Sequence, residues 1–106
     1  MKTIEIGVEK VAVAFNGEEF IINPDLPIDT IKKITRMQSD SGNDYEKNIE
    51  FIQNSIKEYL YVENDIEKVD KFVSSLRSVS SLKAYRAITA IITDAQKGEI
   101  EEKKSV

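Results

Sequence analysis

An Asn-Gly pair at positions 16 and 17 constrains the fold of this chain more than any other feature of its sequence. The pair separates two short apolar runs, and Asn-Gly is favoured in two-residue hairpin turns because both turn residues need a positive φ. A two-residue loop also fixes the register, so Val13 should lie opposite Phe20. The sequence therefore predicts an N-terminal β-hairpin with one face formed by Val11, Val13, Phe15, Phe20 and Ile22.

The residues on either side of this hairpin set its limits. Ile4, Ile6 and Val8 alternate with other residues and could add a third strand, with Glu9-Lys10 as a tight turn. A simple hairpin and a three-stranded meander are therefore both compatible with the sequence. The segment from Asn23 to Pro27 ends the β region, because proline stops a strand and suits the first turn of a helix.

Apolar residues then recur at helical spacing in about four segments. The first helix should run from about residue 27 to 38, and it carries a narrow stripe with a repeat of three: Ile28, Ile31, Ile34 and Met37. The second should begin after an Asp44 cap, with one face made of Tyr45, Ile49, Ile52, Ile56, Tyr59 and Leu60.

Two further helices follow in the second half of the chain. The third should be capped by Asn64 or Asp65, with a face made of Ile66, Val69, Phe72, Val73 and Leu76. The fourth should end at Gly98, with a face made of Ala84, Tyr85, Ile88, Ile91, Ile92 and Ala95. We therefore predict an α+β fold: a hairpin or small meander followed by a helical bundle, forming a single domain over residues 1–98. Residues 99–106 are charged and show no periodicity, and they should form a disordered tail.

The composition argues against catalysis. The chain has no cysteine and no histidine, which leaves no disulfide, no thiolate or imidazole ligand and no Ser-His-Asp triad. Carboxylate or lysine chemistry stays open in principle, but Glu18 and Glu19 should point to opposite faces of a strand. The four glycines form no phosphate-binding loop. We expect no enzyme activity, no cofactor and no metal.

Charge and hydropathy restrict the other classes of function. The net charge is −4, whereas nucleic-acid binders usually carry a basic stripe, so we expect no binding to DNA or RNA. No apolar run approaches the roughly 20 residues that cross a bilayer, and the start of the chain lacks the apolar core of a signal peptide. A cytoplasmic protein that binds other proteins is the expectation that remains.

Two aromatic residues lie off the predicted inner faces. On a helical wheel, Phe51 and Tyr61 fall well away from the apolar stripe of the second helix. One interpretation is a wider buried face, or a helix that ends before Tyr61. The other is a partner-binding patch, because aromatic side chains are favoured anchors at interfaces. Phe51 and Tyr61 are therefore the candidate partner-binding residues.

The order of these features resembles a known family. A start of Ile4-Glu5-Ile6-Gly7, an Asn-Gly hairpin, the segment from Phe20 to Asp25 and then amphipathic helices resemble the tail assembly chaperones of long-tailed phages and prophages of Gram-positive bacteria. The likeness extends roughly over residues 4–98. Many of these chaperones also exist in a longer frameshifted form, and Lys103-Lys104 can be encoded by an A-rich slippery heptamer.

The resemblance implies binding to the tape measure protein, and to tail tube subunits, during tail assembly in the host cytoplasm. It implies stoichiometric action without ATP, and it transfers no particular binding residues. The sequence leaves two alternatives open: a small acidic regulatory protein that binds another protein, and a helix-turn-helix regulator that binds DNA. The narrow stripe on the first helix and the open edge of the hairpin leave room for a homo-oligomer.

Overall fold

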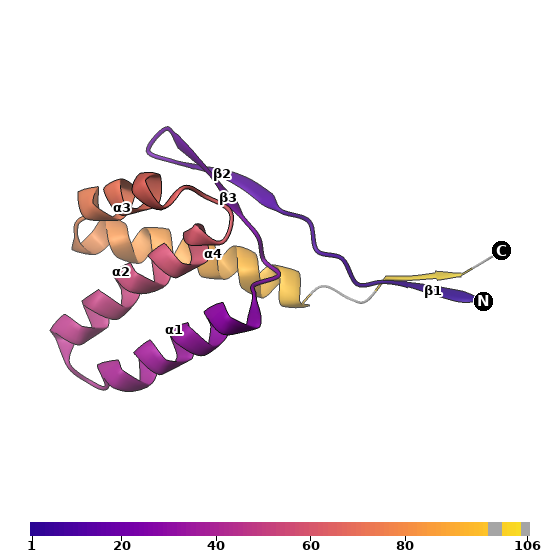
Figure 1. Cartoon of the computed structure of the whole chain (residues 1–106), viewed down its shortest axis with the longest axis horizontal. Helices are drawn as coiled ribbons and strands as arrows, with labels where there is room; N and C mark the ends of the chain where they lie inside the picture. The colour runs from indigo at the N-terminus through magenta and orange to yellow at the C-terminus, as the bar shows by residue number, and fades with distance from the viewer. Residues whose placement is uncertain (98–100, 105–106) are drawn as a thin grey trace.

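The computed structural model describes residues 1–97 and 101–104, and it describes side chains for residues 1–97. It confirms the α+β fold, with a hairpin followed by four helices (Figure 1). Strands β2 (Val11–Phe15) and β3 (Glu18–Ile22) pair antiparallel in the predicted register, with Val13 opposite Phe20. The turn residues Asn16 and Gly17 have φ values of 52° and 82°, as a primed hairpin turn requires.

Four helices follow: α1 (Ile28–Ser41), α2 (Tyr45–Tyr61), α3 (Ile66–Ser75) and α4 (Ser78–Lys97). The predicted caps are confirmed, because Asp44 accepts a hydrogen bond from the Lys47 N–H and Asp65 accepts one from the Lys68 N–H. Helix α1 extends to Ser41, beyond the predicted end near residue 38, and stops before Gly42, whose φ is 54°. Gly98, the predicted end of the fourth helix, lies outside the described residues.

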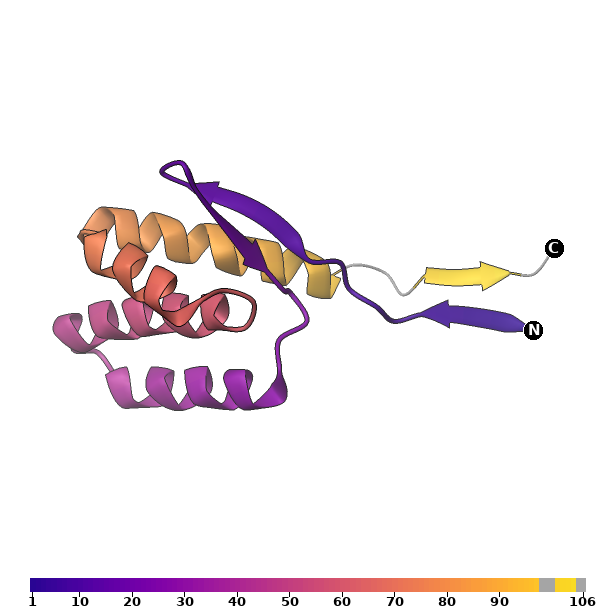
Figure 2. The same cartoon turned by 45° about the horizontal axis from the view of Figure 1, so that its top comes forward.

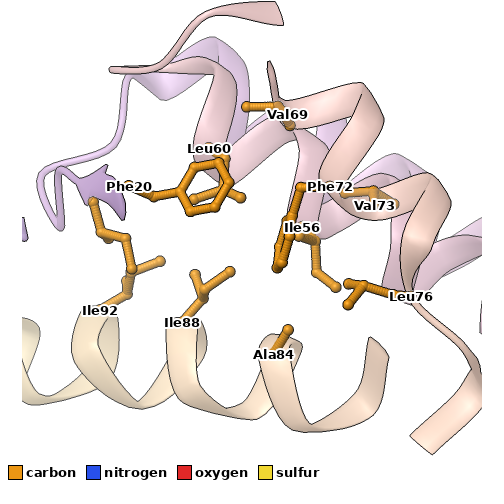
Figure 3. Close-up of a cluster of buried hydrophobic side chains, with 11 residues drawn as sticks. Phe20, Ile56, Leu60, Val69, Phe72, Val73, Leu76, Ala84, Ile88 and Ile92 are labelled. Atoms are coloured by element: carbon orange, nitrogen blue, oxygen red, sulfur yellow. The ribbon is translucent and has the colours of Figure 1, made fainter. Parts of the chain in front are cut away.

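The core lies between the hairpin and helices α2, α3 and α4 (Figure 3). The ring of Phe20 from β3 packs 4.8 Å from that of Phe72 on α3, between centroids. Every residue of this core stands at a predicted inner position, and the core consists of Phe20, Ile22, Ile56, Leu60, Val69, Phe72, Val73, Leu76, Ala84, Ile88 and Ile92.

The predicted inner faces are wrong at the start of three helices. Ile28, Tyr45 and Ile66 are each the first residue of a helix, and all three are exposed. The helical wheel extends the inner face to the first residue of a helix, whereas these three side chains add nothing to the core. Ile31, one turn into α1, is also exposed.

The two ends of the chain form a separate ribbon. Strand β1 (Lys2–Glu5) pairs antiparallel with β4 (Glu101–Lys104), with Ile4 opposite Glu102. Strand β1 is not hydrogen-bonded to β2, so the three-stranded meander is wrong. Residues 101–104 form a paired strand, where the sequence led us to expect part of a disordered tail. Pairing between distant parts of a chain leaves no local signal in the sequence. Figures 1 and 2 show this ribbon standing away from the helices.

Polar contacts fasten the base of the hairpin to the helical body. Glu63, just after α2, accepts hydrogen bonds from the Lys10 ammonium at 3.0 Å and from the Asn23 side-chain amide at 3.1 Å. These two hydrogen bonds, in that order, lower the pKa of Glu63 below its usual value. The contacts hold both ends of the hairpin against the connection between α2 and α3.

Candidate partner-binding surface

Phe51 lies half-buried on α2, where it faces α4. Its ring meets the ring of Tyr85 edge-on, with the centroids 6.1 Å apart and the planes at 66°. It also lines a shallow pocket of about 280 Å³ at the junction of α1 and α2, together with Met37, Lys47 and Glu50. Phe51 is therefore partly packed within the bundle and presents only part of its ring to solvent.

Tyr61 is the last residue of α2, and it is also half-buried. Its ring packs against the core, and its hydroxyl donates a hydrogen bond to the carboxylate of Asp70 on α3. Burial, followed by this hydrogen bond, raises the pKa of Tyr61 to about 12. The side chain therefore ties α2 to α3.

The structure does not bring these two candidate residues together. They are ten positions apart on one helix, which separates them by roughly 15 Å along its axis. Phe51 contacts α4 and Tyr61 contacts α3. Their positions favour the interpretation of a wider buried face, because α2 packs against α1, α3, α4 and β3 and so has more than one inner side.

An apolar surface that includes neither Phe51 nor Tyr61 lies on α1. Helix α1 packs mainly against α2, and an open groove of about 240 Å³ lies between α1 and α4. We call this the α1–α4 groove; its lining residues are Leu26, Ile31, Ile34, Thr35, Tyr59, Thr89, Ile92, Thr93 and Gln96. Ile31, 44% exposed, lines this groove, and Ile28, 70% exposed, lies about one turn before it on α1. The signal in the sequence was the narrow stripe with its repeat of three.

A second apolar groove, of about 320 Å³, lies beside the hairpin. We call it the hairpin groove; β2 and its turn contribute Ala14, Phe15 and Asn16, α3 and the residue after it contribute Phe72 and Leu76, and α4 contributes Ser80, Lys83, Ala84 and Ala87. No residue of β3 lines it, so it opens on the β2 side of the hairpin. The ring of Phe15 stacks on that of Phe72 at the floor, 5.6 Å between centroids.

The described residues form no cluster of candidate metal ligands. Among residues 1–97 and 101–104, no three acidic side chains gather into a possible metal site. None of the helices described there is both long enough and apolar enough to span a bilayer. Comparisons with protein-family models, with curated proteins and with solved structures found no match to this chain.

Proposed function

We propose that this chain is a non-enzymatic protein-binding factor that acts as a tail assembly chaperone and binds the tape measure protein during tail morphogenesis. The observation that supports this proposal best is the exposed apolar ridge of α1 beside the α1–α4 groove. Exposed apolar side chains that line a groove are typical of surfaces that bind other proteins. A small body with such a surface can bind its partner stoichiometrically, without any chemical step.

The spacing of the ridge suits a helical partner. Ile28, Ile31 and Thr35 follow one another at intervals of three and four residues along α1. Rows with this spacing form ridges into which the side chains of another helix fit. Tyr59 and Ile92 add apolar surface on the floor of the groove, and Thr89, Thr93 and Gln96 give it a polar edge. An amphipathic helix that lays its apolar face into such a groove is a common form of recognition.

The binding test compares two matched isoleucines. Ile28 is the first residue of α1 and is 70% exposed, and Ile66 is the first residue of α3 and is 60% exposed. An aspartate in the first turn is compatible with either helix, so both variants should fold. Ile28→Asp should weaken binding of the full chain to the tape measure protein encoded beside it by about tenfold or more, since burial of an isoleucine is worth about 1.5–3 kcal/mol. Ile66→Asp should leave the affinity nearly unchanged.

The results of these binding measurements test the identity of the partner and the position of the binding surface separately. Absence of binding between the wild-type chain and the tape measure protein, by calorimetry and by co-purification, would reject the chaperone function. Binding that Ile28→Asp and Ile66→Asp weaken equally would keep the function and reject the α1–α4 groove as its site. An A-rich slippery heptamer at codons 103 and 104, with an open −1 frame, would add independent support.

A further inference from the structure

The two outer edges of the hairpin are not equivalent. In an antiparallel hairpin with a two-residue turn, Phe15 and Glu18 form a hydrogen-bonded pair, and every second pair after them does too. The backbone groups of the residues between them point outward. On β3 these residues are Glu19 and Ile21, and on β2 they are Ala12 and Ala14.

Two side chains hydrogen-bond to the outward backbone groups of β3: Asn64, just before α3, and Lys68, on α3. The Asn64 amide nitrogen donates to the Ile21 carbonyl oxygen at 2.8 Å, and the Asn64 side-chain oxygen accepts from the Ile21 N–H at 3.0 Å. The ammonium group of Lys68 donates to the carbonyl oxygen of Glu19. These polar groups occupy the positions that another strand would need.

The edge of β2 is open. Within residues 1–97 and 101–104, β2 pairs only with β3, and no hydrogen bond reaches the outward backbone groups of Ala12 and Ala14. Proteins usually protect such an edge with charges, proline or a bulge. Residues 11–15 contain no charged residue and no proline, and the apolar hairpin groove lies directly beside this edge.

We propose that two copies of this chain pair antiparallel through their β2 edges, about a two-fold axis at Val13. Ala12 of each copy then lies opposite Ala14 of the other, and each such pair exchanges two backbone hydrogen bonds. The result is a four-stranded sheet in the order β3–β2–β2–β3. The hairpin groove of each copy then lies beside the β2 strand of the other. This proposal does not depend on the chaperone function.

The sequence of β2 fits its own copy. The two outward-facing residues, Ala12 and Ala14, stand symmetrically about Val13, so one register satisfies both at once. In that register Val11 faces Phe15 of the other copy, and aromatic residues pair favourably with β-branched residues across strands. Each copy has a net charge of −4, but residues 11–15 carry no charge, so these strands do not repel each other when they pair.

The test removes the outward N–H of Ala14, which donates a hydrogen bond in the proposed dimer. Ala14→Pro leaves the β2–β3 hydrogen bonds in place, because the N–H of Ala14 points away from β3, and proline is tolerated on an edge strand. Ala14→Val is the matched control, because it keeps that N–H and places a β-branched side chain at an exposed strand position. Sedimentation equilibrium should show the wild type and Ala14→Val shifting from one chain to two with concentration. Ala14→Pro should raise the dissociation constant about tenfold or more.

A second measurement does not depend on any variant. Hydrogen exchange of the wild-type chain should protect the amides of Ala12 and Ala14 at high concentration and release them on dilution. A chain that stays monomeric, or a dimer that a folded Ala14→Pro variant retains, would overturn the proposal. So would amides of Ala12 and Ala14 that become protected only when the tape measure protein is added, because the edge would then receive a foreign strand.

Discussion

At the scale of single residues, three tyrosines couple the stability of the fold to alkaline pH. Burial raises the pKa of Tyr59 to about 12, and its interaction with Tyr85 adds to the effect. Burial likewise raises the pKa of Tyr85, and the pKa of Tyr61 lies at about 12 for the reasons given above. The folded chain therefore holds these phenol protons more tightly than an unfolded chain, in which a tyrosine titrates near pH 10.

This difference predicts a loss of stability above pH 10. A group whose pKa is higher in the folded state contributes its full stabilisation below the unfolded pKa, and loses it as the pH rises through the folded pKa. The unfolding free energy, measured by urea denaturation, should therefore fall between about pH 10 and 12. Tyr59→Phe combined with Tyr61→Phe should make this fall shallower, whereas lysine titration is the same in both proteins. An equal slope in both would show that these phenols do not carry the effect.

At the scale of the elements, local sequence signals determine the hairpin turn and the helix caps. Contacts between distant elements determine which other side chains are buried. Asn16-Gly17, Asp44 and Asp65 act on their immediate neighbours, so the sequence alone was enough to place them. A helical wheel assumes one buried face. On such a wheel Phe51 and Tyr61 fall off the apolar stripe of α2. In the structure α2 packs against several elements, and the two side chains contact α4 and α3.

The same contrast gives a prediction for two isoleucines on neighbouring helices. Ile56 on α2 is fully buried and Ile66 on α3 is 60% exposed, although the sequence placed both on inner faces. Ile56→Ala should lower the unfolding free energy by about 2–5 kcal/mol, because it removes buried methyl groups and leaves a cavity. Ile66→Ala should change it by less than about 0.5 kcal/mol. Chemical denaturation with matched m-values checks both, and comparable losses would contradict the position of the core.

At the scale of the whole molecule, the structure separates a packed body from the ribbon formed by the chain ends. Among residues 1–97, the buried apolar residues all fall between Phe20 and Ile92, and residues 1–10 are exposed. A two-stranded ribbon on its own is marginally stable in water, and Ile4 remains exposed in it. The ribbon therefore contributes little to the stability of the body, even though it pairs the two ends of the chain.

Removal of residues 99–106 tests this separation, because it deletes β4 and leaves the core residues in place. The melting temperature of the shortened chain should stay within about 2 °C of the full chain, since a loss of 1 kcal/mol would shift it by about 4–8 °C in a domain of this size. The amides of β1 that are hydrogen-bonded to β4 should lose their protection at the same time, because β1 then has no paired strand. A matched chain that keeps its length but carries both Glu102→Pro and Lys103→Pro should show the same loss of protection, because one of two neighbouring N–H groups on β4 points to β1 and proline removes it. A large fall in melting temperature in either protein would mean that the ribbon supports the body, and that the paired ends belong to its cooperative unit.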